Sequence, residues 1–293
     1  MSYIFLVLSI ISMSTSNIFG GYYTRRTSDK KDTSALYSFV QLLIIFLLWG
    51  VLFCFKFSFD IKVIPYSLLF AVCFAAATIG KMFAFKTGPV MLTGLIVQMS
   101  LIAVCIWGLI FWNEKFSAKI GIGLVLVSLS LWLSLYKGKD KSGEKKKISI
   151  KWILFCAISF VGNAGCTIVQ TEQQMRFDGQ HKNMLMFFAT FFAMLLGLAL
   201  YLKSDKTDTK AILKTETPFP VLAGAFNVAL NYFVMALATA VPLLSSSFRF
   251  SAIGVGGLII TSLFSLFAFK EKLKWWQWIG VGLGIVATCL LSN

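Results

Sequence analysis

Long apolar runs, separated by short polar segments, fill the whole chain. Nearly every run is about 20 residues long, the length that an α-helix needs to cross a hydrocarbon core of about 30 Å. Strands of a membrane barrel would be about 10 residues long and would alternate polar with apolar residues, so the pattern predicts helices. The predicted spans are 3–23, 35–55, 64–86, 89–112, 118–136, 152–172, 183–202, 218–240, 242–269 and 275–292.

The composition agrees with a membrane protein. Of the 293 residues, 58% are hydrophobic and only 13% are charged, whereas soluble domains are about one quarter charged. The net charge of +15 could indicate a nucleic-acid partner. The basic residues lie between the apolar runs, however, where they act as topology signals. The expected fold class is an all-α membrane protein with ten transmembrane helices, and its expected partners are the lipid bilayer and a small-molecule substrate, not nucleic acid.

The two halves of the chain share one closing pattern. In the first half Glu114 is followed nine residues later by Gly123, and in the second half Glu271 is followed nine residues later by Gly280. The two patterns are 157 residues apart, which indicates a duplicated five-helix unit. Because each unit has an odd number of spans, the two copies must run in opposite directions through the membrane. The sequence therefore predicts two inverted repeats.

A basic segment separates the predicted repeats. We expect a first repeat at 1–140, a linker at 141–150 and a second repeat at 151–293. Lys and Arg are far more frequent in the odd-numbered loops, which include this linker, than in the even-numbered loops. The positive-inside rule then places the odd-numbered loops in the cytoplasm and both termini outside.

Three short motifs resemble the drug/metabolite transporter superfamily, in its ten-helix EamA-like branch. They are Thr87-Gly88-Pro89 before the fourth span, Glu114-Lys115-Phe116, and Glu271-Lys272-Leu273 with Trp276-Gln277-Trp278-Ile279-Gly280 after it. The resemblance implies a carrier of small metabolites or drugs that works by alternating access through a cavity between two five-helix halves. It also implies a multi-pass protein of the bacterial plasma (inner) membrane. Ten-helix relatives are usually placed with cytoplasmic termini, the opposite of the charge pattern, so both orientations stay open.

Catalytic and metal-binding patterns are missing from the sequence. It contains no HExxH motif and no His-rich cluster, and its single histidine, His181, lies in a loop. The six cysteines form no CxxC pair and are interpreted as small hydrophobic side chains. No enzymatic activity, cofactor or metal is expected. With no nucleotide motif either, transport would be uniport, exchange or ion-coupled.

Two basic residues, Lys81 and Arg249, lie inside apolar runs, whereas every acidic residue lies in a loop or near a helix end. An exporter that trades protons for cationic drugs normally needs a carboxylate inside the membrane. The pattern therefore favours an anionic or zwitterionic substrate, with Arg249 as its main electrostatic partner and Lys81 as a second. The alternative is that both side chains extend to the lipid headgroups.

Polar side chains also recur inside the apolar runs, where they must face protein or water. Candidate substrate-binding residues are Arg249, Lys81, Gln98, Asn163, Thr167, Gln170, Asn227, Asn231 and Asn17. Hydrogen bonds between helices are the alternative role for such groups. The predicted function is a secondary transporter of a small polar metabolite. A flippase for a lipid or lipid-linked sugar on the same scaffold is the alternative. Two fused repeats can form the cavity in a monomer, and a dimer is also open.

Overall fold

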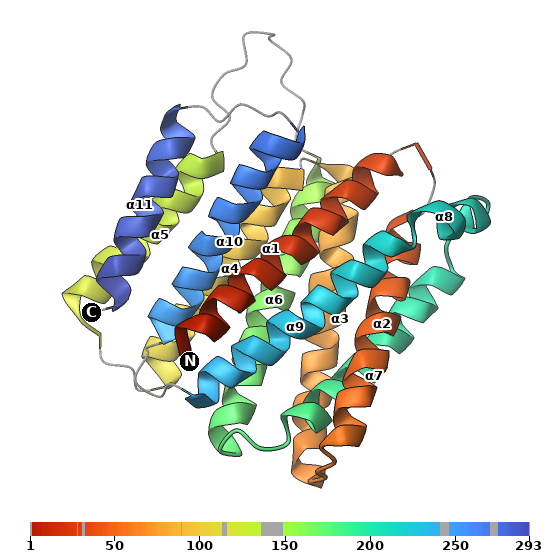
Figure 1. Cartoon of the computed structure of the whole chain (residues 1–293), viewed down its shortest axis with the longest axis horizontal. Coiled ribbons are helices and arrows are strands. Elements are labelled where there is room, and N and C mark those ends of the chain that lie inside the picture. Colours follow the sequence, from red (N-terminus) through yellow and green to blue (C-terminus); the bar gives the residue numbers. More distant parts are fainter. Residues whose placement is uncertain are drawn as a thin grey trace.

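The structure is a computed structural model that describes residues 2–27, 29–30, 33–88, 90–112, 116–135, 149–240, 246–269 and 275–292. Helices form nearly all of this described part, which contains no strand (Figure 1). The helices are α1 (Ser2–Arg26), α2 (Thr33–Phe55), η1 (Ile61–Val63, a 3-10 helix), α3 (Ile64–Thr87), α4 (Val90–Phe111), α5 (Ala118–Leu135), α6 (Ile150–Arg176), α7 (Lys182–Leu202), α8 (Thr209–Glu216), α9 (Pro218–Ala240), α10 (Ser246–Phe269) and α11 (Trp275–Ser292).

Each predicted span coincides with one of the long helices, with bounds that differ by a few residues. In the part of the chain that is described, six segments are long and apolar enough, by length and composition, to cross a membrane. They are Tyr3–Arg26, Thr33–Phe55, Ile61–Thr87, Ile150–Arg176, Lys182–Leu202 and Pro218–Leu237. Shorter apolar stretches lie in α4, α5 and α11. The prediction of an all-helical, multi-pass membrane protein agrees with these segments, and a full set of ten crossings stays a prediction.

The short helix α8 is the element that the sequence pattern did not predict. It lies in the connection between α7 and α9 that we expected to be a loop. Its Ile212 is buried against a cluster that includes Tyr23 and Ala223, and Glu216 forms an ion pair with Arg26 at 3.5 Å. A helix of eight residues with one buried apolar side chain is too short to show a periodic pattern. Its helical state is decided by packing against α1 and α9.

The helices of the first half pack against those of the second half throughout the bundle (Figure 1). Helix α1 packs along α9 and helix α3 packs along α6, while α2 pairs with α7, α4 with α10, and α5 with α11. Further contacts join α3 to α7 and α2 to α9, and also α4 to α6 and α1 to α10. The two halves therefore share their packing surfaces.

Helices α3 and α6 approach each other more closely than side chains would allow. A Cβ atom on Gly162 would lie 2.5 Å from the backbone nitrogen of Ala77 and 2.6 Å from the carbonyl oxygen of Cys73. Next to it, the Ser159 hydroxyl donates to the carbonyl oxygen of Ala77 at 3.0 Å. Small residues allow such backbone contact between membrane helices. This contact sets the position of Lys81, one turn further along α3.

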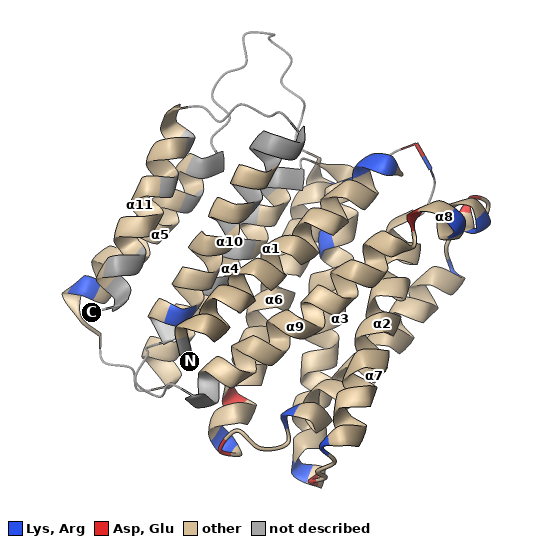
Figure 2. Cartoon of the chain, in the orientation of Figure 1, with Lys and Arg blue, Asp and Glu red and all other residues tan. Residues whose placement is uncertain are grey.

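Charged side chains gather at the two ends of the bundle, and most of its middle carries none (Figure 2). Figure 1 shows both chain termini at the same end of the bundle. The opposite end, where α1, α3 and α7 finish, carries the larger set of described basic residues: Arg25, Arg26, Lys30, Lys86, Lys151, Lys203, Lys206, Lys210 and Lys214. The end with the termini carries Lys56, Lys62, Lys119, Arg176 and Lys182. Glu114, Glu271 and residues 136–148 of the predicted linker lie outside the described residues.

Candidate functional site: a polar cavity among six helices

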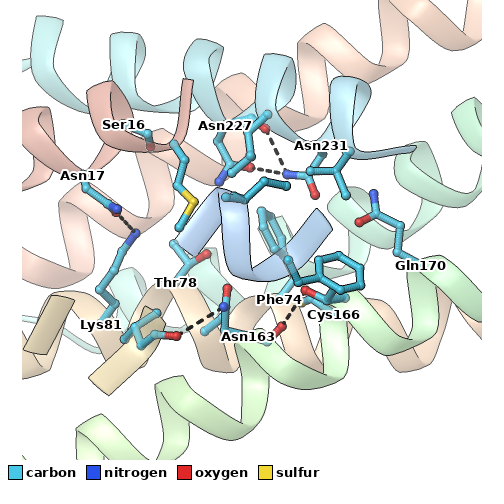
Figure 3. A pocket seen from close by; sticks show the side chains of 18 residues that line it. Ser16, Asn17, Phe74, Thr78, Lys81, Asn163, Cys166, Gln170, Asn227 and Asn231 are labelled. Carbon is cyan, nitrogen blue, oxygen red and sulfur yellow. Dashed lines mark hydrogen bonds between the residues drawn. The ribbon is translucent and has the colours of Figure 1, made fainter. Parts of the chain in front are cut away.

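A cavity of about 110 Å³ lies among α1, α3, α4, α6, α9 and α10 (Figure 3). One water molecule needs about 10–15 Å³ by the same measure, so the cavity holds several. Its lining residues are Met13, Ser16, Asn17, Phe74, Ala77, Thr78, Lys81, Val97, Asn163, Cys166, Thr167, Gln170, Asn227, Leu230, Asn231, Val234, Phe250 and Ile253. Most of them lie near the middle of their helices, so the cavity is a polar space inside an apolar bundle.

Lys81 supplies the formal charge at this site. Its Nζ atom donates a hydrogen bond to Oδ1 of Asn17 at 3.2 Å, which joins α3 to α1 on one side of the cavity (Figure 3). Among the described residues that line the cavity there is no Asp or Glu. An ammonium group in such a place is stabilised by polar atoms or by an anion, because a charge that leaves water without a partner is costly. The cavity can therefore accept a negatively charged group beside Lys81.

Amide side chains line the remainder of the cavity, and part of their bonding capacity is used within the protein. Asn231 donates from Nδ2 to Oδ1 of Asn227 at 2.9 Å. Asn163 donates from Nδ2 to Oγ of Ser100 at 2.6 Å, a bond from α6 to α4. These bonds fix the two amides in place, as expected if some polar groups serve helix association. They also orient further amide lone pairs and N–H groups for a ligand.

Gln170 lies across the cavity from Lys81 (Figure 3). Its side chain is only 4% exposed, and its Nε2 atom has no hydrogen-bond partner in the described structure. A buried amide donor without a partner costs about 1–3 kcal/mol. A bound molecule with an acceptor atom would remove that cost.

The cavity gathers most of the residues that the sequence marked as candidates. Asn17, Lys81, Asn163, Thr167, Gln170, Asn227 and Asn231 all line it. Arg249 does not; it lines a second, smaller cavity that shares Gln170 with the first. The side chain of Gln98 lies outside the described residues. Whether these residues bind a substrate stays a prediction.

Three polar or soft lining residues were not among the candidates. Ser16 precedes Asn17, and Thr78 precedes Lys81 by one helical turn, so both share a helix face with a candidate. That spacing could have identified them. Cys166 was interpreted as a hydrophobic side chain, although it borders the cavity together with Thr167.

Cys166 allows a direct test of whether the cavity is open to water. We expect a variant that retains only Cys166 to react with a small, charged thiosulfonate reagent, because a membrane-inserted carrier must expose this cavity to one aqueous side. A variant that retains only Cys105, which is fully buried and lines no part of the cavity, is the matched control. Modification rates measured by mass shift should differ strongly. Equal rates for the two variants would contradict a water-accessible cavity.

The comparison with known families concerns the second half of the chain. Residues 150–293 match the profile of the EamA-like transporter family. This half is an EamA-like transporter domain. The match is consistent with the drug/metabolite transporter superfamily, and the resemblance found in the sequence is confirmed over this range. The family implies a membrane transporter of the drug/metabolite type, and its members are transporters and not enzymes.

The fold itself extends over both halves. A solved structure described as "Crystal structure of protein" matches with a TM-score of 0.71 and covers 99% of this chain and 95% of its own. The two sequences are 12% identical, so the likeness concerns the fold alone. No curated protein sequence matches the chain.

Proposed function

We propose that the protein is a secondary transporter that moves a small anionic or zwitterionic metabolite by alternating access. The observation that carries this proposal is the polar cavity in the middle of the bundle, with the ammonium group of Lys81 in its wall and no carboxylate among its described lining residues. The EamA-like domain supports transport as the activity. The chemistry of the cavity wall supports the class of solute.

Alternating access needs two halves that can exchange their roles, and we propose inverted repeats at 1–140 and 151–293 with a linker at 141–150. The packing supports this division. If α1–α5 correspond to α6, α7, α9, α10 and α11, the contact of α3 with α6 corresponds to the contact of α9 with α1. In the same way, α4 with α6 corresponds to α10 with α1, and α3 with α7 to α9 with α2. Adding 157 to the bounds of α5 gives 275–292, the bounds of α11.

The solute class follows from the two sides of the cavity. Beside Lys81, a carboxylate or phosphate oxygen could replace or join the Asn17 oxygen as hydrogen-bond acceptor. Across the cavity, the amides of Gln170 and Asn231 can bond hydroxyl or ammonium groups. A small molecule with an acid group at one end and a neutral polar or ammonium group at the other fits this arrangement.

For orientation we propose that the more basic end of the bundle, where α1 and α3 finish, faces the cytoplasm. Both termini then lie on the outer side of a bacterial plasma membrane. We further propose that one chain suffices, because helices from both halves of the same chain surround the cavity.

Uptake into proteoliposomes tests the proposal. The purified full chain is reconstituted and offered radiolabelled carboxylates, phosphate esters, amino acids and cationic amines, each with and without a pH gradient. We expect saturable uptake of an acidic or zwitterionic solute and no uptake of the amines. Strong pH-driven flux of a cation would contradict the proposed solute class. Transfer of labelled lipids between leaflets, with no uptake of any solute, would favour the flippase.

A further inference from the structure

A second, much smaller cavity lies beside the central one, among α6, α9 and α10. It is lined by Gln170, Thr171, Val234, Met235, Leu237, Arg249, Phe250 and Ile253, and its volume is about 10 Å³. Gln170 borders both cavities, as do three apolar residues. The small cavity is therefore separated from the central one by the side chain of a single polar residue and its apolar neighbours.

The polar groups around this small cavity are mainly hydrogen-bond donors. Arg249 contributes a guanidinium group, which can donate but cannot accept. Gln170 contributes the buried Nε2 group that has no partner in the described structure. Thr171 adds a hydroxyl, and the remaining lining residues are apolar. Arg249 also lies in the first turn of α10, at the positive end of the helix dipole.

Negative charge is missing from the described wall of the same cavity. The neighbouring carboxylate is Glu172, which follows Thr171 in α6. Its Oε1 atom accepts a hydrogen bond from Nε1 of Trp112 at 2.8 Å, and Glu172 is not a lining residue. The donors that converge on the cavity thus face no acidic side chain there.

From these groups we propose that the small cavity binds one inorganic anion such as chloride, held by the guanidinium of Arg249 and the Nε2 group of Gln170. A volume of about 10 Å³ corresponds to a single water-sized particle. It is too small for an organic acid, so the occupant differs from the solute of the central cavity. In a low-dielectric surrounding, an anion contacted by a cation and an amide donor is held more strongly than water would be.

Gln170 couples the two cavities. When its Nε2 group donates to the anion, its Oε1 atom is available to the central cavity as an acceptor. A solute with a hydroxyl or ammonium group is then favoured at that side. Anion binding itself is independent of the proposed function, whereas this effect on transport rests on it.

Chloride-35 NMR on the purified full chain, without any organic solute, tests the binding. We expect the protein to broaden the chloride signal and bromide to reverse the broadening by competition. Arg249→Gln and Gln170→Met should each weaken chloride affinity by about tenfold or more, the loss expected for one charge-assisted hydrogen bond. Arg176→Gln is the matched control, because Arg176 is exposed and bonds to the hydroxyl of Tyr66.

A second measurement protects the test against variants that fold poorly. Chloride should raise the unfolding temperature of the wild-type chain relative to gluconate at equal ionic strength, because a ligand that binds only the folded state stabilises it. Equal unfolding temperatures in the two salts, or equal broadening by the wild type and Arg249→Gln, would overturn the proposal and leave a water molecule as the occupant. Lys81→Met should leave the chloride signal unchanged. If it removes the broadening, the anion binds in the central cavity and the proposed small site is wrong.

Discussion

Lys81→Met is expected to abolish uptake of the acidic solute at concentrations at which the wild-type carrier is half-saturated. The substitution keeps the length of the side chain and removes its charge, which is the formal charge among the described residues of the central cavity wall. A hydrogen bond to a charged group contributes about 1.5–3 kcal/mol, so the solute affinity should fall roughly ten- to hundredfold. Concentration-dependent uptake into proteoliposomes measures this change as an increase in KM.

The matched control is Lys86→Met, a substitution on the same helix. Lys86 is exposed, and its Nζ atom donates to the carbonyl oxygen of Lys30 at 3.0 Å. It does not line the cavity, so its loss should leave KM unchanged. Uptake by Lys81→Met with the KM of the wild type would show that Lys81 does not bind the solute. The chloride signal described above provides an independent check that the variant is folded.

Gly162→Ala is expected to destabilise the protein more than any other single methyl group added on the outside of the cavity. The new Cβ atom would lie 2.5 Å from the backbone nitrogen of Ala77, a backbone atom that cannot rotate away. Helices α3 and α6 must therefore separate, which breaks the neighbouring hydrogen bond of Ser159. Overpacking of this kind costs about 1–3 kcal/mol, a large share of the stability of an ordinary domain. Unfolding followed by tryptophan fluorescence measures the loss.

Gly282→Ala is the control for this second prediction. Gly282 is also helical, but a Cβ atom there meets nothing within 4 Å. Alanine has a higher helix propensity than glycine, so the control should be neutral or slightly stabilising. If both variants unfold at the same temperature, the close contact of α3 and α6 does not limit stability. A further consequence of the contact is that Gly162→Ala should also impair solute binding, since the contact positions Lys81 relative to Asn163.

The number and positions of the long helices could be predicted from the sequence because the bilayer restricts the choice of structure. A backbone that crosses hydrocarbon must satisfy all its hydrogen bonds internally, and a helix of about 20 apolar residues does so. Lys81 and Asn163 could be selected as candidates for a related reason. A polar side chain inside an apolar run cannot face lipid cheaply, so it must face other helices or water.

Other features could not be predicted from the local pattern. Helix α8 is helical because Ile212 and Glu216 find partners on α1 and around α9, contacts that its eight residues do not specify. The distribution of the two basic residues over two cavities was also unexpected. In a membrane helix, lipid-facing and protein-facing positions are both apolar, so the sequence does not reveal how each helix is rotated. The rotation of α10 places Arg249 beside the small cavity, and the rotation of α3 places Lys81 beside the central one.

By itself, the sequence determined that this chain is a bundle of membrane helices with polar and basic groups kept inside it, because the solvent around those helices is hydrocarbon. Only the tertiary structure decided which of those groups meet. The close approach of α3 and α6 at Gly162 and the bond from Lys81 to Asn17 depend on how the helices pack across the two halves. Helix packing is a property of matched surfaces far apart in the sequence, and no single apolar run contains both of them.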